Sequence, residues 1–379
     1  MNKIIFVILA VVVVLFNACN TPEDNNRDKK ETIVENKKDT VVIVKYDTII
    51  KTKIVTKVIN SKEKIDSKNI KETKKIAPLP SWNNNSIKKQ IILFVSEAIN
   101  KESKNYIPVE NRIVTFDSDG TLWPEKPTYY QIEFILYRIK QLSEKNPEIK
   151  EDKLIQTAVD HDLDLLRKKY GIKGLGRLMR IAQKDLTVEN TKKITNDWYR
   201  NAKHPTKDKL FVDLIYQPMK ELIEYLKQNQ FKVYIVANGG VDFMRVIVKQ
   251  AFDIPTENVI GSYQKMEYNS NTLTKKDEIF FISEGENKPV AIYYIIGKKP
   301  VMSVGNSDKD IPMLEWSSSS EYNNLQIIIH HTDSVREWSY DKNVNVGELD
   351  KALKEADKNN WLIMDMKKDW KYIYSYEVK

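Results

Sequence analysis

The most informative stretch of this chain is Ile113-Val114-Thr115-Phe116-Asp117-Ser118-Asp119-Gly120-Thr121. Its first four residues are β-branched or aromatic and predict a buried strand, and the Asp-x-Asp-Gly run after them predicts a turn. Asp117 and Asp119 then lie at the carboxyl end of the strand, the edge where open α/β sheets bind their ligands. One carboxylate can attack phosphorus while the second transfers a proton. The stretch therefore predicts a catalytic pair of carboxylates on an α/β fold.

Three later segments are predicted to be strands that end at the same edge. Residues 231–236, 301–304 and 325–329 are mainly apolar runs, which are typical of parallel strands buried on both faces. Polar residues and glycines follow them in the runs Asn238-Gly239-Gly240, Gly305-Asn306-Ser307-Asp308-Lys309-Asp310 and His330-His331-Thr332-Asp333. The pattern predicts one site assembled from four strand ends.

A helical insertion is predicted between the first strand and the second, because no strand is predicted between residues 124 and 204. Apolar residues at helical spacing predict its helices over residues 129–145, 152–170, 174–184 and 189–201. Two further helices are predicted outside the insertion, over residues 86–101 and 217–228.

Four features resemble, in their order along the chain, the motifs of the haloacid dehalogenase superfamily. They are Asp117-x-Asp119-Gly120-Thr121, the turn at 236–240, Lys288 and the run at 305–310. The chain is most similar to the phosphoserine-phosphatase-like hydrolases, over a match from about residue 105 to the C-terminus. The resemblance implies an α/β fold, with a Rossmann-like parallel sheet core and an α-helical cap inserted at about residues 124–211.

The resemblance also implies roles for the motif residues. Asp117 is the nucleophile that forms an aspartyl-phosphate, Asp119 is the general acid and base, and Lys288 screens the charge of the reacting groups. The implied cofactor is Mg²⁺, which prefers oxygen ligands. Its implied ligands are Asp117, the backbone carbonyl of Asp119, and the motif-four residues Asn306, Asp308 and Asp310. The contacts to a phosphorylated small-molecule substrate are expected from Thr121, Asn238, Gly239 and Gly240.

Two residues depart from the family pattern. Ala237 stands where a Ser or Thr usually donates to the phosphate, although Asn238 and the glycine amides can donate instead. Asn306 stands where an Asp is usual. The leading hypothesis is a Mg²⁺-dependent phosphomonoester hydrolase, and the alternative is a catalytically weak relative that binds phosphorylated ligands or partner proteins. A phosphotransferase, a phosphonate hydrolase or a dehalogenase is a third alternative, but dehalogenation does not need Asp119.

Some motif residues also have a purely structural interpretation. Lys288 can be a solvated surface lysine, and Asp308 and Asp310 can cap the helix that follows them. His330 and His331 are neighbours on a strand and point to opposite faces, so structural pinning of the C-terminal loop is favoured over substrate contact or a shared metal ion.

The insertion carries no motif that identifies the substrate. Arg177 and Arg180 are candidates for binding an anionic group, and a solvated helix face is the simpler explanation.

The N-terminus has the pattern of an export signal. Met1-Asn2-Lys3 is a short basic start, residues 4–16 are an apolar run, and Asn17-Ala18-Cys19 follows. The run is shorter than the ~20 apolar residues of a membrane-spanning helix. Residues 1–18 resemble a bacterial lipoprotein signal, which implies lipidation of Cys19, the only cysteine. The implied location is the cell envelope, with the protein lipid-anchored to a bacterial membrane and facing the periplasm or exterior. A plain signal peptide is the alternative.

Residues 19–80 are predicted to be a disordered polar tether, because they have too little apolar surface to offset the entropy of ordering. The alternation in its weak repeat, 39–45 against 47–51, can also form strands. The hydrolase domain is expected over residues 81–379. The net charge of +8 comes from scattered lysines and no groove-reading motif is visible, so nucleic acid is not an expected partner.

Overall fold

The computed structural model describes residues 31–36, 39–44 and 78–378, and the chain divides into two compact units, Met1–Lys74 and Lys75–Lys379. In the first unit, β1 (Glu31–Asn36) pairs with β2 (Asp39–Val44) as an antiparallel hairpin. The alternating segment at 39–45 thus contains a strand. The predicted signal, Cys19 and most of the predicted tether lie outside the described residues. Within the described part of the chain, no helix is both long and apolar enough to span a membrane.

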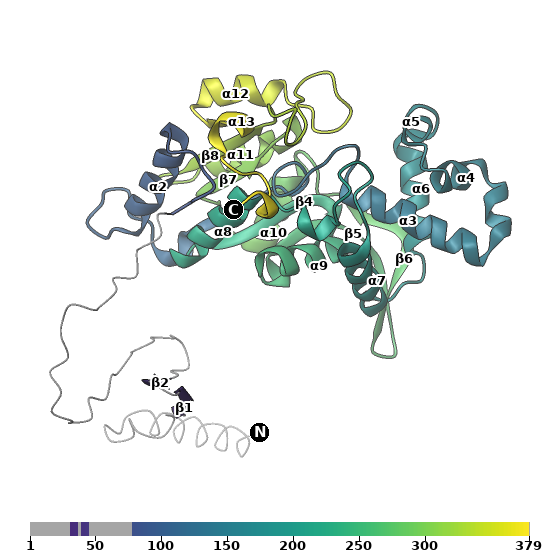
Figure 1. Cartoon of the computed structure of the whole chain (residues 1–379), viewed down its shortest axis with the longest axis horizontal. Helices are drawn as coiled ribbons and strands as arrows, with labels where there is room; N and C mark the ends of the chain where they lie inside the picture. Colours follow the sequence, from purple (N-terminus) through teal and green to yellow (C-terminus); the bar gives the residue numbers. More distant parts are fainter. Residues whose placement is uncertain (1–30, 37–38, 45–77, 379) are drawn as a thin grey trace, which may run out of the picture. The chain divides into compact units, whose positions relative to one another are not determined.

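The second unit is built on a seven-stranded sheet with the order β6-β5-β4-β3-β7-β8-β9 (Figure 1). Its strands are β3 (Ile113–Phe116), β4 (Lys232–Gly240), β5 (Val259–Asn269), β6 (Thr272–Phe281), β7 (Met302–Gly305), β8 (Leu325–His330) and β9 (Leu362–Asp365). Every neighbouring pair is parallel except β5 with β6. The predicted α/β fold with a mainly parallel sheet is therefore confirmed, and the four predicted strands are β3, β4, β7 and β8.

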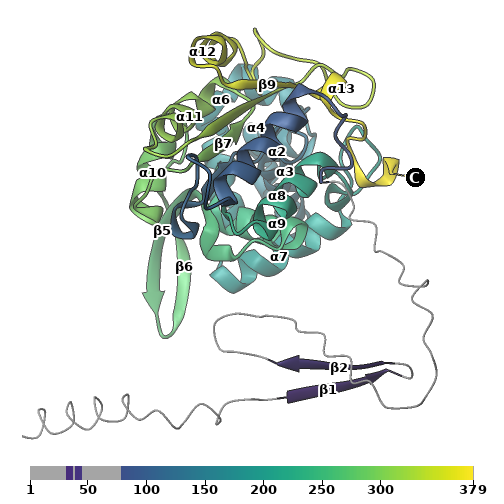
Figure 2. The same cartoon turned by 90° about the vertical axis from the view of Figure 1, so that its left-hand side faces the viewer.

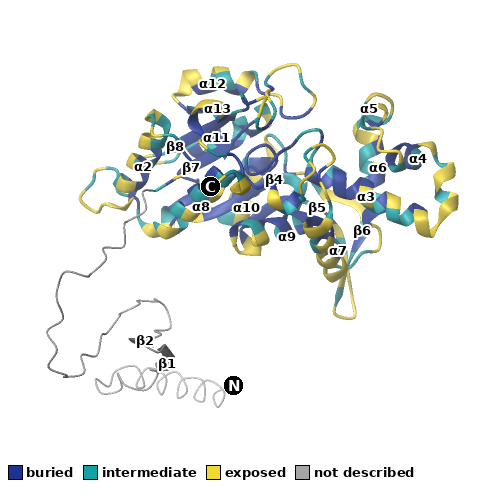
Figure 3. Ribbon diagram, viewed as in Figure 1, coloured by how far each residue is buried: buried dark blue, intermediate teal, exposed yellow. Residues whose placement is uncertain are grey.

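Helices cover both faces of this sheet, and the alternation of side chains along each strand decides which helices they meet. Val114 and Phe116 pack in one cluster with α2 (Ser86–Ile99), α8 (Gln217–Gln228) and α9 (Val241–Phe252). Ile113 packs in a second cluster with α10 (Asn287–Ile296), α11 (Ile311–Ser318) and α12 (Lys351–Asn359). The central strands are accordingly buried between outer helices (Figure 3). The short α13 (Met366–Asp369) follows β9.

The predicted helical insertion lies between β3 and α8. Its helices are α3 (Tyr130–Lys145), α4 (Lys153–Val159), α5 (Leu163–Leu165), α6 (Gly171–Gln183) and α7 (Val188–Asn201). Ile135, Leu154 and Leu178 belong to an apolar core of its own. We refer to α3 through α7 as the cap.

The prediction of one helix over residues 152–170 is wrong at its middle. The helix α4 ends at Val159, and His161 adopts a left-handed φ of 57°. Asp162 then caps the next turn, because its side chain accepts a hydrogen bond from the Leu165 amide at 2.9 Å. A π-helical segment, Leu166–Tyr170, leads into α6.

The β5–β6 hairpin was not predicted; it forms one edge of the sheet and projects beyond the other strands (Figure 2). The backbone amide of Lys275 in β6 donates to the carbonyl of Leu186 at 3.0 Å, and its Nζ donates to Gln183 of α6 at 2.9 Å. The cap is therefore fastened to the sheet through this hairpin as well as through its own two ends.

Candidate active site

The first motif loop is held against the ends of the strands next to it. Asp117 follows β3, and its backbone amide donates to the carbonyl of Val304 in β7 at 2.9 Å. Gly120 has a left-handed φ of 77°, and a Cβ atom there would collide with the side chain of Asn306. From the end of β8, His331 Nε2 lies 2.7 Å from the carbonyl oxygen of Gly120. The strand-end pattern therefore does bring these segments together.

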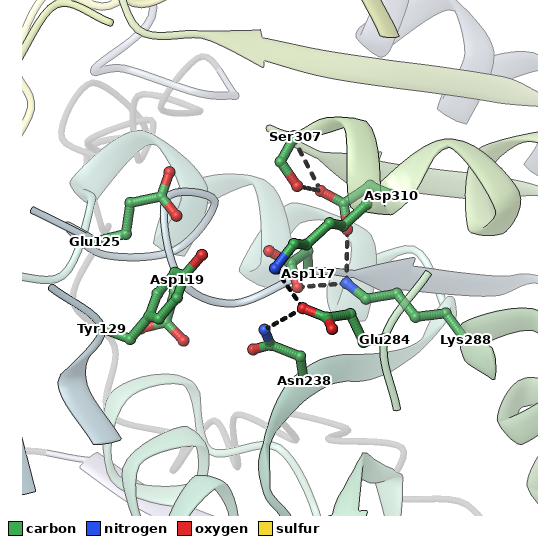
Figure 4. A pocket seen from close by; sticks show the side chains of 10 residues that line it. Asp117, Asp119, Glu125, Tyr129, Asn238, Glu284, Lys288, Ser307 and Asp310 are labelled. Atoms are coloured by element: carbon green, nitrogen blue, oxygen red, sulfur yellow. Dashed lines mark hydrogen bonds and ion pairs between the residues drawn. The ribbon is translucent and has the colours of Figure 1, made fainter. Parts of the chain in front are cut away.

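Lys288 is the centre of a buried ion-pair network (Figure 4). Its Nζ lies 2.6 Å from Asp117 Oδ1 and 2.6 Å from Asp310 Oδ1. Lys288 lies in the first turn of α10 and is 2% exposed, so it is not a solvated surface lysine. Burial by itself would lower the pKa of Lys288, but the two carboxylates reverse this effect and hold its pKa above the usual range. The ammonium group is therefore charged, and it links the first motif to the last.

Asp117 and Asp119 are both buried, and both have a raised pKa. Burial, with a contribution from Asp310, raises the pKa of Asp117 to about 7, although Lys288 opposes the shift. Burial raises the pKa of Asp119 to about 6, although its Oδ1 accepts a hydrogen bond from Trp123 Nε1 at 2.9 Å. A carboxyl group with such a pKa can both release and accept a proton near neutral pH. This property suits the general acid and base role that the resemblance implies for Asp119.

Asn306 is fixed by hydrogen bonds from both ends of its amide. Its Nδ2 donates to Glu125 Oε1 at 2.7 Å, and its Oδ1 accepts from the Thr121 hydroxyl at 2.9 Å. Tyr340 donates to the same Glu125 oxygen at 2.7 Å. Thr121 is fully buried and does not line the pocket, so its expected contact with the phosphate is replaced by a contact with Asn306.

The two carboxylates of the last motif have different partners. Asp310 Oδ2 accepts from the amides of Asn306 and Ser307 at 3.1 and 3.0 Å, while its Oδ1 faces Lys288. Asp308 instead accepts hydrogen bonds from the amides at the start of α12, those of Asp350, Lys351 and Ala352. Asp308 does not line the pocket, and its expected role as a metal ligand is therefore corrected to a helix cap.

The end of β4 presents Asn238 to the pocket. Side chains alternate along a strand, so Ala237 packs on the same side as Val233 and Ile235, in the apolar core, while Asn238 lines the pocket. Gly239 is not among the pocket residues, and the amide of Gly240 donates to Gln131 Oε1 at 2.7 Å. Of the predicted donors on this strand, the structure therefore places the Asn238 side chain at the pocket.

Five lining residues were not predicted from the sequence: Glu125, Tyr129, Glu284, Ser307 and Lys309 (Figure 4). Glu284 pairs with Lys309 and accepts from Asn238 Nδ2 at 3.4 Å. Burial would raise the pKa of Glu284, but the Lys309 ammonium holds it below the usual range. Glu125 had one visible signal, which is an acidic residue directly after the apolar run Leu122-Trp123-Pro124.

The oxygen donors at this pocket fit a divalent cation. The carboxyl groups of Asp117, Asp119, Glu125 and Asp310 are buried and line the same pocket, and burial raises the pKa of Glu125 as it does those of the two motif-one aspartates. A cation would offset this excess of acidic groups, and an all-oxygen donor set suits Mg²⁺. Across the described residues, no three acidic, His or Cys side chains already converge as metal ligands.

The remaining candidates have structural partners. His331 is 1% exposed and stacks on Tyr340 at a ring distance of 4.5 Å, in agreement with structural pinning. His330 lies 3.8 Å from Asp341. In the cap, Arg177 pairs with Asp152 at 2.5 Å and Arg180 pairs with Asp277 at 2.7 Å, and neither arginine lines the pocket.

The chain belongs to the haloacid dehalogenase-like hydrolases, because that family matches residues 112–317, more than half of the sequence. The prediction of a hydrolase of this family is confirmed. No curated protein sequence matches this chain significantly.

Several solved structures are similar to part of this chain. A conserved protein of unknown function from Anaerococcus prevotii is 16% identical, with a TM-score of 0.48, over 73% of this chain and 91% of that one. A phosphoserine phosphohydrolase-like protein from Francisella tularensis is 16% identical, with a TM-score of 0.33, over 57% of this chain and 86% of that one. A phosphoserine phosphatase, solved as an analogue of its phospho-aspartyl intermediate, is 17% identical, with a TM-score of 0.33, over 70% and 96% of the two chains.

Proposed function

We propose that the protein is a Mg²⁺-dependent phosphomonoester hydrolase that acts through an aspartyl-phosphate. The observation that carries the proposal is the buried contact of Lys288 with Asp117, next to Asp119 with a pKa of about 6. A nucleophile, a positive charge beside it and a proton carrier are the three groups that this reaction requires from the protein.

In the first step, a carboxylate oxygen of Asp117 attacks the phosphorus atom, and the bond from phosphorus to the alcohol oxygen breaks. Asp119, in its protonated form, donates its proton to the departing alcohol oxygen. Lys288 stabilises the negative charge that the carboxylate and the phosphoryl group bring together.

In the second step, a water molecule attacks the phosphorus of the aspartyl-phosphate while Asp119 takes a proton from that water. The bond between phosphorus and the Asp117 oxygen breaks, inorganic phosphate leaves, and both carboxyl groups return to their starting states. Proton transfer by a positioned carboxyl group contributes ~10²–10⁴-fold to such a rate.

Asp117, Asp119 and Asp310 all line the pocket, so the groups that would hold Mg²⁺ are the Asp117 carboxylate, the backbone carbonyl of Asp119 and the Asp310 carboxylate. The Asn306 side-chain oxygen has a second lone pair besides the one facing Thr121, but Asn306 does not line the pocket. When bound, the ion would neutralise charge on the phosphoryl oxygens. Asn238, which lines the pocket, would donate to those oxygens.

The alternative is a catalytically weak relative that binds phosphorylated ligands or partner proteins. Its first motivation was Ala237, and this motivation is weakened because Asn238 reaches the pocket while Ala237 packs in the core. Its second motivation, Asn306, remains.

The cell location is part of the proposal. The lipoprotein-like start and Cys19 support a lipid anchor in a bacterial membrane, with the hydrolase domain facing the periplasm or exterior.

The test is hydrolysis of p-nitrophenyl phosphate by the full-length protein, with Mg²⁺ and after chelation. We expect turnover that requires Mg²⁺, a loss of at least ~10³-fold in kcat for Asp117→Asn, and a covalent phosphate on wild-type protein quenched in acid. Asp357→Asn is the matched control, because this aspartate is exposed on α12 and does not line the pocket. Equal turnover by wild type and Asp117→Asn would overturn the assignment, and tight binding of phosphate esters without turnover would favour the alternative.

A further inference from the structure

A second, larger cavity of about 650 Å³ adjoins the catalytic pocket, between the cap and the β5–β6 hairpin. The two share four lining residues, Tyr129, Asn238, Glu284 and Lys309. A molecule whose phosphate lies at Asp117 therefore has its remaining atoms directed into this space. Cavities that bind small organic ligands have volumes of ~300–1,000 Å³.

The walls of this cavity carry many apolar side chains. They come from α3, α6, α9 and β6 and include Ile132, Ile172, Leu175, Met179, Val241 and Ile279. Ile172 is 90% exposed, whereas Leu178 and Ala182 of the same helix pack in the core of the cap. Exposure of an isoleucine side chain to water is unfavourable. An apolar ligand that covered these residues would therefore bind with a favourable hydrophobic free energy.

Most of the charged groups in the same walls are already paired within the protein. Lys275 Nζ lies 3.1 Å from Asp242 and 2.9 Å from Gln183, and Glu284 pairs with Lys309. A strongly polar ligand would have to compete with these contacts. One buried donor is open: Gln131 is 6% exposed, and its Nε2 atom has no hydrogen-bond partner in the described part of the chain.

We infer that the substrate is a phosphate monoester of an alcohol with an extended apolar body, and that this body occupies the larger cavity between the cap and the β5–β6 hairpin. An acceptor oxygen near the ester would bind Gln131 Nε2. This inference rests on the proposed function, and it excludes small polar esters such as phosphoserine as preferred substrates.

The first arm of the test compares n-propyl, n-pentyl and n-heptyl phosphate with phosphoserine as substrates of the full-length protein. We expect kcat/KM to rise by up to about fourfold for each added methylene that enters the cavity, and phosphoserine to be a poor substrate. A kcat/KM that is flat across the alkyl series, or highest for phosphoserine, would overturn the inference while leaving the phosphatase proposal intact.

The second arm uses Leu175→Gln, with thermal melting as the check that the variant is folded. We expect kcat/KM of this variant to depend less on the length of the alkyl chain than that of the wild type. The matched control is Leu165→Gln in α5, since Leu165 is exposed on the same cap but does not line the cavity, and it should keep the full dependence.

A third arm does not need turnover. Calorimetric titration with n-propyl- and n-heptylphosphonate should show tighter binding of the longer chain, by more than about tenfold. If no ester is hydrolysed and the longer phosphonate still binds more tightly, the proposed function fails and the apolar cavity stands. If the two phosphonates bind equally, the cavity does not hold the apolar body.

Discussion

The amide nitrogen of Asn306 donates to the Glu125 carboxylate at 2.7 Å, and both side chains are buried. With its nitrogen held in this way, the amide oxygen of Asn306 faces Thr121. The Glu125 carboxyl group thus lies next to position 306, where the family usually has an aspartate. An aspartate at position 306 would lack this donor and would leave two buried acidic side chains in contact. The neutral residue and its acidic neighbour are best understood as a pair.

Replacing Asn306 with the aspartate that the family usually has should therefore destabilise the protein. We expect Asn306→Asp to lower the free energy of unfolding by about 1–3 kcal/mol in metal-free protein, because it removes the donor to the buried Glu125 carboxyl group and leaves that acceptor without this hydrogen bond. The double variant Asn306→Asp/Glu125→Gln should recover most of this loss, measured by urea unfolding. A stable Asn306→Asp single variant would contradict the pairing.

Removing the side chain of Asn238 should weaken phosphate binding. We expect Asn238→Ala to raise the KM for p-nitrophenyl phosphate by about tenfold, since a hydrogen bond to a charged group contributes ~1.5–3 kcal/mol, and Asn238→Ser to recover part of the effect. Ala237→Ser is the comparison. Its hydroxyl would enter the packed core, so we expect no improvement in KM and some loss of stability. A lower KM for Ala237→Ser would show that the donor belongs at position 237.

The raised pKa of buried Asp117 should make the stability of the metal-free protein depend on pH. The pKa of Asp117 rises from 3.8 to about 7 on folding, so the folded protein holds a proton that the unfolded chain has released. The contribution of this proton to the free energy of unfolding is fully present below about pH 4 and is lost as the pH rises through about 7. We expect Asp117→Asn, which carries no charge, to melt progressively higher than wild type as the pH is raised from 5 to 8 in chelator.

Two further melts check this assignment. Adding Mg²⁺ at pH 8 should raise the melting temperature of wild type more than that of Asp117→Asn, because the ion binds the ionised carboxylate. A melting difference between the two proteins that does not change with pH would mean that Asp117 is not the group with the raised pKa.

Membrane attachment should depend on Cys19. A single acyl chain binds membranes only marginally, whereas the diacyl modification of a lipoprotein cysteine supplies a second chain. We expect the full-length protein to fractionate with membranes and to incorporate labelled palmitate, and Cys19→Ser to remain an unprocessed precursor or to be released. Unlipidated soluble wild-type protein, with an N-terminus other than residue 19, would show that the segment is only an export signal.

The parts of the fold with continuous apolar runs could be predicted from the sequence. The predicted helix 217–228 coincides with α8, and all four predicted strands lie in the sheet. The β5–β6 hairpin was missed because Lys275, Lys276 and Asp277 interrupt any apolar alternation in β6, an edge strand. The strand β9 has only four residues and gives too short a pattern to recognise.

The site was predicted where a motif fixes the chemistry and missed where only the fold brings residues together. Asp117 and Lys288 lie far apart in the sequence and are in contact, as the resemblance implied. The difference between Asp308 and Asp310 depends on a single 3₁₀ turn, which points one carboxylate to α12 and the other to Lys288. Spacing alone does not reveal such a turn.

The contact between Asp308 and the start of α12 affects when the active site can form during synthesis of the chain. The loop that carries Asn306 and Asp310 is held by amides at residues 350–352, and the loop after Asp117 is held by His331. Both contacts come from beyond residue 317, where the family match ends. The ribosome therefore adds Asp117 long before it adds the segments that fix its surroundings. A nascent chain interrupted near residue 320 would contain every motif of the family and still lack the support that shapes its active site.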